Sequence, residues 1–105
     1  MTKLTRDYVR DICRGYHERR REIEIGDKGR PRRAELLQEY IRLNTAVDRA
    51  LLLVESETLR VQIKAALTDG KGFETMFEHF CGRNQFYALK RRVRNEVARL
   101  LNLIE

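Results

Sequence analysis

The chain has 105 residues, of which 42% are hydrophobic and 36% charged, with one Pro and no Trp. A chain of this length fits one domain with a modest core, and the composition is typical of an ordered helical protein rather than a disordered tail. The formal net charge is +6, which favours a polyanionic partner. The basic excess lies in residues 1–33 and 80–105, whereas residues 34–79 carry more acidic than basic side chains.

Neither the N-terminal sequence nor the cysteine content indicates export or membrane insertion. The first residues lack the apolar stretch of a signal peptide, and the longest apolar run, Ala50–Val54, has five residues, far fewer than a membrane span needs. Cys13 and Cys81 are the two cysteines and stand far apart in the chain. We therefore expect free thiols, a cytoplasmic location and no membrane partner.

The N-terminal half predicts two long helices. Thr5 suits a helix N-cap, and apolar residues then recur at three- and four-residue steps, which predicts a helix from about Arg6 to Ile25. Gly26–Pro31 ends this helix, and its proline fits the first turn of the next one. A wide apolar stripe continues from there to Val54 over about six turns. These two helices are expected to pack as an antiparallel hairpin.

The C-terminal half predicts a helix-turn-helix. Ser56 is a candidate N-cap for a third helix, which ends near Gly70. Phe73–Phe80 keeps helical spacing over about two turns, Gly82 interrupts it, and a last helix begins near Asn84 and continues to the C-terminus. A short helix, a tight turn with Gly and a longer helix form this motif.

Residues 1–105 are together expected to form one all-α domain. A long helical hairpin plus a third helix in residues 1–69 supplies packing and a homodimer contact, and residues 70–105 form the C-terminal helix-turn-helix part. The homodimer is a hypothesis, because one recognition helix rarely provides enough affinity and specificity alone.

The last helix carries side chains suited to DNA on its outer face. If its apolar residues face the core, a rotation of about 100° per residue leaves Asn, Gln, Ala and Arg side chains outside. Asn and Gln pair with adenine at two positions, Arg does so with guanine, Ala leaves room for a thymine methyl group, and Arg or Lys hold phosphates. The candidate base-reading residues are Arg83, Asn84, Gln85 and Ala88, and the candidate backbone anchors are Tyr87, Lys90, Arg91, Arg92 and Arg94.

The last third of the chain also resembles a known family. The corner Gly70–Phe73, the turn and helix start Cys81–Tyr87, and the continuation Arg91–Leu101 are similar to the C-terminal part of the ArpU and RinA type of late-gene transcription regulators of phages and prophages. The resemblance implies a transcriptional role, a sigma-factor-like DNA-binding part with a recognition helix starting near Arg83, and contact with bacterial RNA polymerase. Gly82 stands where many such regulators have Ser or Thr, which leaves the helix N-cap to Asn84 or to backbone groups.

The basic residues also have other interpretations. The last helix would look the same if its basic face were merely solvated, if the chain were a helical protein-protein interaction module such as a phage accessory protein acting on a host complex, or if it bound nucleic acid by charge alone. Two basic clusters flank the linker, Arg19–Arg21 and Arg30–Arg33. They either contact DNA phosphates or are solvated side chains whose charge is balanced by nearby acidic residues. Four aromatic residues are expected in the core rather than in a base-stacking platform: Phe73, Phe77, Phe80 and Phe86.

The sequence does not favour a metal site or catalysis. Cys13, His17, His79 and Cys81 could in principle form a tetrahedral zinc site, but Cys13 lies on an apolar stripe and the other pair lacks the usual spacing of zinc ligands. No Ser-His-Asp arrangement or phosphate-binding loop is suggested. We therefore expect no enzyme activity, no metal and no cofactor.

Overall fold

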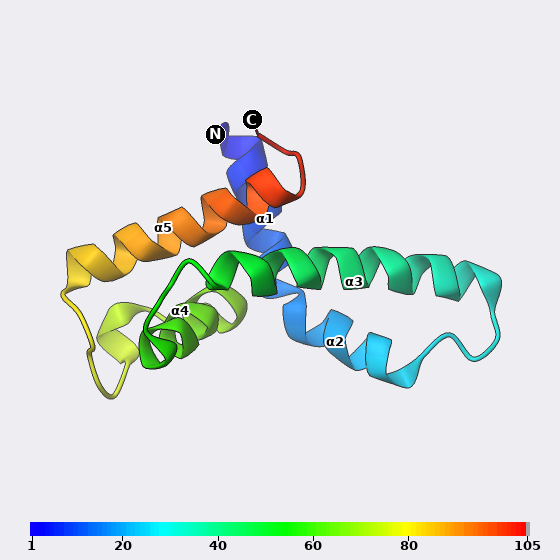
Figure 1. The fold of residues 1–105 in the computed structure, drawn as a ribbon, viewed down its shortest axis with the longest axis horizontal. Helices are drawn as coiled ribbons and strands as arrows, with labels where there is room; N and C mark the ends of the chain where they lie inside the picture. The colour runs from blue at the N-terminus through cyan, green and yellow to red at the C-terminus, as the bar shows by residue number, and fades with distance from the viewer. Residues whose placement is uncertain (105) are drawn as a thin grey trace.

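The computed structural model describes residues 1–104, and this part of the chain is all-helical (Figure 1). It contains five α-helices and one turn of 3₁₀ helix and has no strand. None of the helices within residues 1–104 combines the length and the apolar character that a membrane crossing needs. The elements are α1 (Lys3–Arg14), α2 (Tyr16–Ile25), α3 (Pro31–Leu51), α4 (Glu57–Asp69), η1 (Phe73–Thr75) and α5 (Arg83–Leu100).

Helix α3 runs along most of the molecule and organises the other helices (Figure 1). It packs against α2, α5, α4 and α1, and α2 reaches as far along it as Asn44 and Asp48. Side chains from α1, α3, α4 and α5, together with Tyr16 of α2, meet in one core because each helix turns apolar residues inward. The largest fully buried side chains are Phe86, Ile63, Val9, Val47, Val54, Val93, Val97 and Cys13.

The helix expected over Arg6–Ile25 is two helices, broken at Gly15. The Arg19 side chain turns back beside the break, where its Nη2 donates to the Ile12 carbonyl oxygen and its Nε donates to Asn44 Oδ1 at 2.7 Å. A Cβ atom on residue 15 would lie 2.6 Å from Arg19 Nη1, so glycine leaves the room that this arginine occupies. The single-helix prediction is therefore wrong, and a buried arginine accompanies the break.

Several helix ends agree with the local sequence signals. Thr2, rather than the expected Thr5, accepts the N-cap hydrogen bond of α1. Pro31 opens α3 and Ser56 caps α4, where Leu59 N donates to Ser56 Oγ at 3.3 Å. Gly70 takes the left-handed conformation that ends α4. Helices α3 and α5 end a few residues earlier than expected, at Leu51 and Leu100.

The two-turn helix expected at Phe73–Phe80 does not form. Only Phe73–Thr75 is helical, as one 3₁₀ turn, and the chain from Met76 to Gly82 is irregular. Phe77 is fully exposed and Phe80 is 48% exposed, whereas Phe86 is completely buried. The prediction that all four phenylalanines lie in the core is therefore wrong for two of them, because the irregular backbone does not hold their side chains on one inward stripe.

Candidate nucleic-acid interface

Helix α5 has one face in the core and one face toward solvent. Phe86, Val93 and Val97 are fully buried, which fixes the rotation of the helix about its axis. Its first residue follows Gly82, and no side chain provides an N-cap hydrogen bond, so Asn84 is not the cap. Among the candidate site residues, Arg83, Asn84, Gln85, Arg91 and Arg92 are exposed, whereas Tyr87, Ala88, Lys90 and Arg94 are partly buried.

The first turn of α5 is tied to η1 through Glu74. Arg83 Nε donates to Glu74 Oε1 at 2.5 Å, and the Tyr87 hydroxyl donates to Glu74 Oε2 at 3.2 Å. The Tyr87 hydroxyl also accepts a hydrogen bond from the Phe73 backbone N–H at 3.3 Å. The hydrogen bond from Arg83 holds the pKa of the Glu74 carboxyl below its usual value. Arg83 and Tyr87 therefore position the connection before α5, while Asn84 and Gln85 have no hydrogen bond to another side chain of residues 1–104.

Lys90 and Arg94 lie on the flank of α5 that faces α1. With Arg14 and the thiol of Cys13 they line a small cavity of about 50 Å³. Burial lowers the pKa of Lys90, and the positive charges of Arg94 and Arg14 lower it further. Burial also raises the pKa of Cys13 to about 11, although nearby Arg94 lowers it. The thiol is 1% exposed, in agreement with the expectation that it packs as a small apolar side chain.

A second, wider cavity opens at the other end of the contact between α1 and α5. It has a volume of about 280 Å³ and is lined by Arg6 and Val9 of α1 and by Arg91, Arg94 and Asn95 of α5. The basic residues of α1 were not among the residues predicted to bind DNA. The signal was present, because Arg6, Arg10 and Arg14 recur every four residues and so share one face of a helix.

Most of these cations have no acidic partner within residues 1–104. The ion pairs of the described chain involve Arg10, His17, Arg20, Arg33, Arg42, Lys64, Arg83 and Arg99. On α5 only its two ends are paired in this way, Arg83 with Glu74 and Arg99 with Glu96. The middle of the helix, from Lys90 to Arg94, therefore presents uncompensated positive charge.

The two basic clusters beside the linker differ from α5. Arg19 is buried and hydrogen-bonded, so it contributes nothing to an outer surface. Arg33 pairs with Glu22 at 2.6 Å and also donates to the Gly26 carbonyl oxygen, which joins the ends of α2 and α3. Arg21, Arg30 and Arg32 are exposed and form no ion pair within residues 1–104. Each cluster thus divides into residues that hold the fold and residues that remain solvated.

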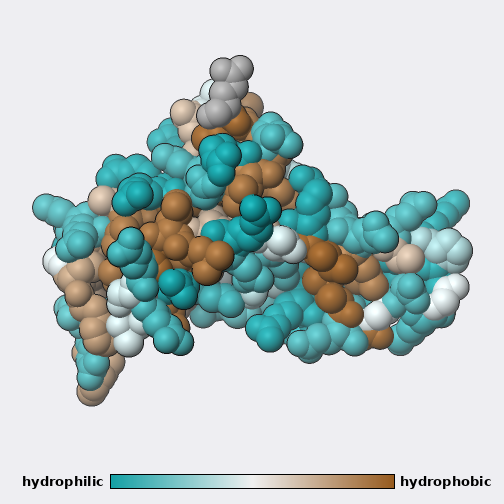
Figure 2. Space-filling view, in the orientation of Figure 1, coloured by the Kyte–Doolittle hydropathy of each residue, from teal (hydrophilic) through white to brown (hydrophobic). Residues whose placement is uncertain are grey.

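An apolar groove lies between α4 and the connection that precedes α5. It has a volume of about 430 Å³, and Figure 2 shows brown and tan surface over this part of the molecule, at the left of the view. Lys71 and Glu78 stand among apolar neighbours at this groove. The apolar side chains that line it are Val61, Ala65, Met76, Phe77 and Phe80.

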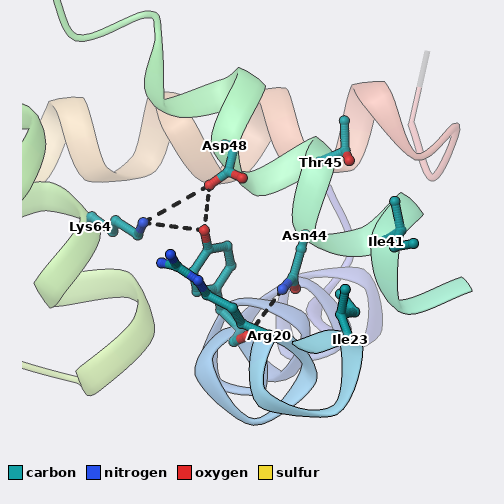
Figure 3. A pocket seen from close by; sticks show the side chains of 8 residues that line it. Arg20, Ile23, Ile41, Asn44, Thr45, Asp48 and Lys64 are labelled. Carbon is teal, nitrogen blue, oxygen red and sulfur yellow. Dashed lines mark hydrogen bonds and ion pairs between the residues drawn. The ribbon is translucent and has the colours of Figure 1, made fainter. Parts of the chain in front are cut away.

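A hollow of about 480 Å³ lies between α2, α3 and α4 and contains a polar network. The Tyr16 hydroxyl donates to Asp48 Oδ1 at 2.6 Å and accepts from Lys64 Nζ at 3.2 Å. Figure 3 shows Lys64 and Asp48 pointing toward one another, with Arg20, Ile23 and Ile41 around the opening. Burial and the hydrogen bond to Asp48 raise the pKa of Tyr16 to about 12. Because these polar groups satisfy one another, the network joins three helices.

The four residues of the conceivable zinc site are not brought together. His17 Nε2 lies 3.1 Å from Thr68 Oγ1 and 3.2 Å from Asp69 Oδ1, at the end of α4. His79 stacks on Phe73 with ring centroids 3.9 Å apart. In the described part of the chain, no three His, Cys, Asp or Glu side chains are grouped so that they could hold a metal ion.

Comparisons of the chain with family models, with curated proteins and with solved structures find no match.

Proposed function

We propose that this protein binds double-stranded DNA through α5 and acts as a transcriptional regulator. The observation that supports this function best is the outer face of α5, on which exposed Asn84 and Gln85 are followed by Arg91 and Arg92, without acidic partners among residues 1–104. Amide side chains at the helix start suit base edges, and unpaired guanidinium groups suit phosphates.

The position of α5 in the fold is favourable for entry into a groove. The helix has 18 residues and is therefore about 27 Å long. Its N-terminal end lies at the edge of the molecule, away from α1, while its C-terminal half packs between α1 and α3 (Figure 1). A major groove about 12 Å wide admits one α-helix, so the exposed first turns of α5 fit the role of a recognition helix.

The DNA-binding unit in this proposal is α4, the connection of residues 70–82, and α5. This connection is longer than the three or four residues of a simple helix-turn-helix, since it contains η1 instead of the expected helix. Base contact by Arg83 also requires that its ion pair with Glu74 opens, whereas Asn84, Gln85 and Ala88 need no such release. We therefore place most of the base recognition on these three residues.

The broader role of the protein rests on the resemblance of its last third to ArpU and RinA type regulators. It supports a phage or prophage origin, action in the bacterial cytoplasm and contact with RNA polymerase. A homodimer through the long helices would place two α5 helices on two half-sites and would supply the affinity that one helix lacks.

Selection from a random duplex library, sequenced after binding at two salt concentrations, tests this function. We expect enrichment of one motif, an altered motif for Asn84→Ala or Gln85→Ala, and uniformly weaker binding with a smaller salt slope for Arg92→Gln. Arg99→Gln is the matched control, because it removes the same charge from the same helix but at a residue paired with Glu96. Failure to enrich any motif would exclude a sequence-specific regulator, and a steep salt slope without enrichment would indicate binding by charge alone.

A protein-protein interaction module is the second candidate function, favoured by the exposed groove around Phe77. Its occupant would be an apolar segment of a host protein, since large exposed apolar surfaces usually mark such contacts. This candidate predicts that Phe77→Ser abolishes capture of a partner while a variant with Glu at positions 91 and 92 retains it. The DNA-binding proposal predicts the opposite pattern for duplex binding.

A further inference from the structure

The contact between α1 and α5 gathers positive charge around two neighbouring cavities, and we call this contact the basic seam. Its two cavities, of about 280 and 50 Å³, share Arg94 and follow one another along α1. Arg10 also lies here, but it is paired with Asp7 at 3.5 Å and with Asp11 at 3.3 Å. The seam is defined by the remaining cations, which have no acidic partner within residues 1–104: Arg6, Arg14, Lys90, Arg91 and Arg94.

Like charges in this arrangement oppose folding unless an anion joins them. Lys90 and Arg94 are partly buried, and the apolar floor of the smaller cavity, Cys13 and Leu67, limits screening by water. The neighbouring charges of Arg14 and Arg94 act on Lys90 strongly enough to lower its pKa in addition to the effect of burial. A bound anion would relieve this repulsion.

A conformational feature of α4 makes room for one of these cations. Gly70 ends α4 in the left-handed conformation, with φ of 72°. A Cβ atom there would lie 2.6 to 2.8 Å from the guanidinium nitrogens of Arg14. The guanidinium group therefore lies against the backbone at the C-terminal end of α4 and lines the same small cavity as Lys90 and Arg94.

We propose that the basic seam binds the phosphate groups of a nucleic-acid backbone, with α1 supplying Arg6 and Arg14 as contacts in addition to those of α5. Arg6 and Arg14 are eight residues apart on α1, a rise of about 12 Å. This distance is more than three times the axial spacing of phosphates on one DNA strand, about 3.4 Å, so the two arginines would contact different phosphates. An extended backbone therefore fits the seam better than a single phosphate ion does.

This inference rests on the proposed function, because the phosphates are those of the duplex that α5 reads. It adds a second helix to the interface: while the start of α5 enters the groove, the strand beside that groove continues past the middle of α5 and across α1. The contacts made there are to the backbone, so they set affinity and register without changing which sequence is preferred.

Measurement of duplex binding against salt concentration tests the basic seam. The variants are Arg6→Gln, Arg14→Gln and their combination in the full chain, with Arg99→Gln as the control of equal charge change. Each α1 substitution should reduce the slope of log K against log salt by about 0.9 and weaken binding at 0.1 M salt by roughly fivefold to tenfold. The double variant should lose about two units of slope, and the preferred motif should be the same for every variant.

A second measurement separates the two sources of phosphate. The unfolding temperature is compared in sodium phosphate and in sodium chloride of equal ionic strength, for the original chain and for the Arg6→Gln/Arg14→Gln double variant. If phosphate stabilises the original chain but not the double variant, the seam holds single phosphate ions as well as a backbone. If phosphate stabilises neither protein but the α1 variants still reduce the salt slope of duplex binding, the seam needs a continuous backbone. Both results support the seam.

Three outcomes would overturn the inference in distinguishable ways. If Arg92→Gln reduces the slope but the α1 variants behave like Arg99→Gln, the seam is not an interface, although the proposed function stands. If the original chain binds no duplex, the proposed function fails, and the seam survives only as a phosphate-ion site, provided that phosphate stabilises the original chain and not the double variant. If the original chain shows neither duplex binding nor stabilisation by phosphate, both the proposed function and the basic seam are refuted.

Discussion

Replacement of Arg19 by Met is the perturbation whose effect follows most directly from the structure. Arg19 is 8% exposed and donates to Asn44 Oδ1 and to the Ile12 carbonyl oxygen. Met preserves much of the apolar stem but provides no donor, so both acceptors lose their partner in a buried position. A buried acceptor left unpaired costs about 1–3 kcal/mol. Removal of a desolvated cation offsets part of this loss, and the expected destabilisation is about 2–4 kcal/mol.

This loss is a large part of the total stability of a small domain, which is typically about 5–15 kcal/mol. Urea unfolding followed by circular dichroism measures it, and an unchanged slope of the free energy against urea would show that the compactness of both states is preserved. Arg20→Met is the matched control, because Arg20 is the exposed neighbour and, among residues 1–104, forms an ion pair with Glu24 alone, at 3.5 Å. Its effect should stay within about 0.5 kcal/mol.

Similar effects of the two substitutions would refute the structural role of Arg19. The same experiment bears on function, because a residue that holds the junction of α1 and α2 is not free to contact phosphate. We therefore expect Arg19→Met to leave the salt slope of duplex binding unchanged under conditions in which the variant is folded. A reduced salt slope in the folded variant would show that Arg19 contributes to phosphate binding.

Three further predictions follow from individual contacts. Glu74→Gln removes a negative charge from the start of α5 and releases Arg83, so anisotropy titrations should show about twofold to tenfold tighter binding to the selected duplex, and unchanged affinity would argue against a role for Arg83. Phe77→Ser should leave the unfolding free energy within about 0.5 kcal/mol, whereas Phe86→Ala should cost about 3–5 kcal/mol in urea unfolding; equal effects would contradict their assigned environments. Burial raises the pKa of Cys13 from 9.0 to about 11, so the native state retains a proton that the unfolded chain loses, and the thiol's contribution to stability should fall by about 2 kcal/mol as pH rises from 9 to 11. The Cys13→Ala variant should lack this component in urea titrations at the two pH values, and an equal decline in both proteins would contradict it.

Local signals in the sequence were sufficient for the helical class and for several boundaries. Pro31 opens a helix, Ser56 caps one and Gly70 ends one, and each acts through backbone groups within a few residues of itself. The apolar spacing of α5 likewise predicted that Phe86 is buried and that Arg92 is exposed, since a helix of known period has only one face to turn inward.

The same kind of signal was wrong where a tertiary contact competed with local preference. The apolar spacing is continuous across Gly15, yet the helix is interrupted there. Arg19, which lies beside the interruption, donates a hydrogen bond to Asn44, a residue 25 positions away. Spacing also predicted an inward stripe at Phe73–Phe80. The chain instead makes one 3₁₀ turn tied to α5 through Glu74, and Phe77 turns outward.

The sequence alone thus determined an all-α chain with a basic last helix, because helix caps and apolar periodicity act over a few residues. The sequence also showed that Arg6 and Arg14 share one face of a helix, but it did not indicate which other helix that face contacts. Only the tertiary structure decided that these two arginines lie beside Lys90 and Arg94, more than seventy positions away, because that proximity depends on how α1 and α5 pack on the shared core. The number of like charges that meet at one surface is a property of helix packing, and no local pattern encodes it.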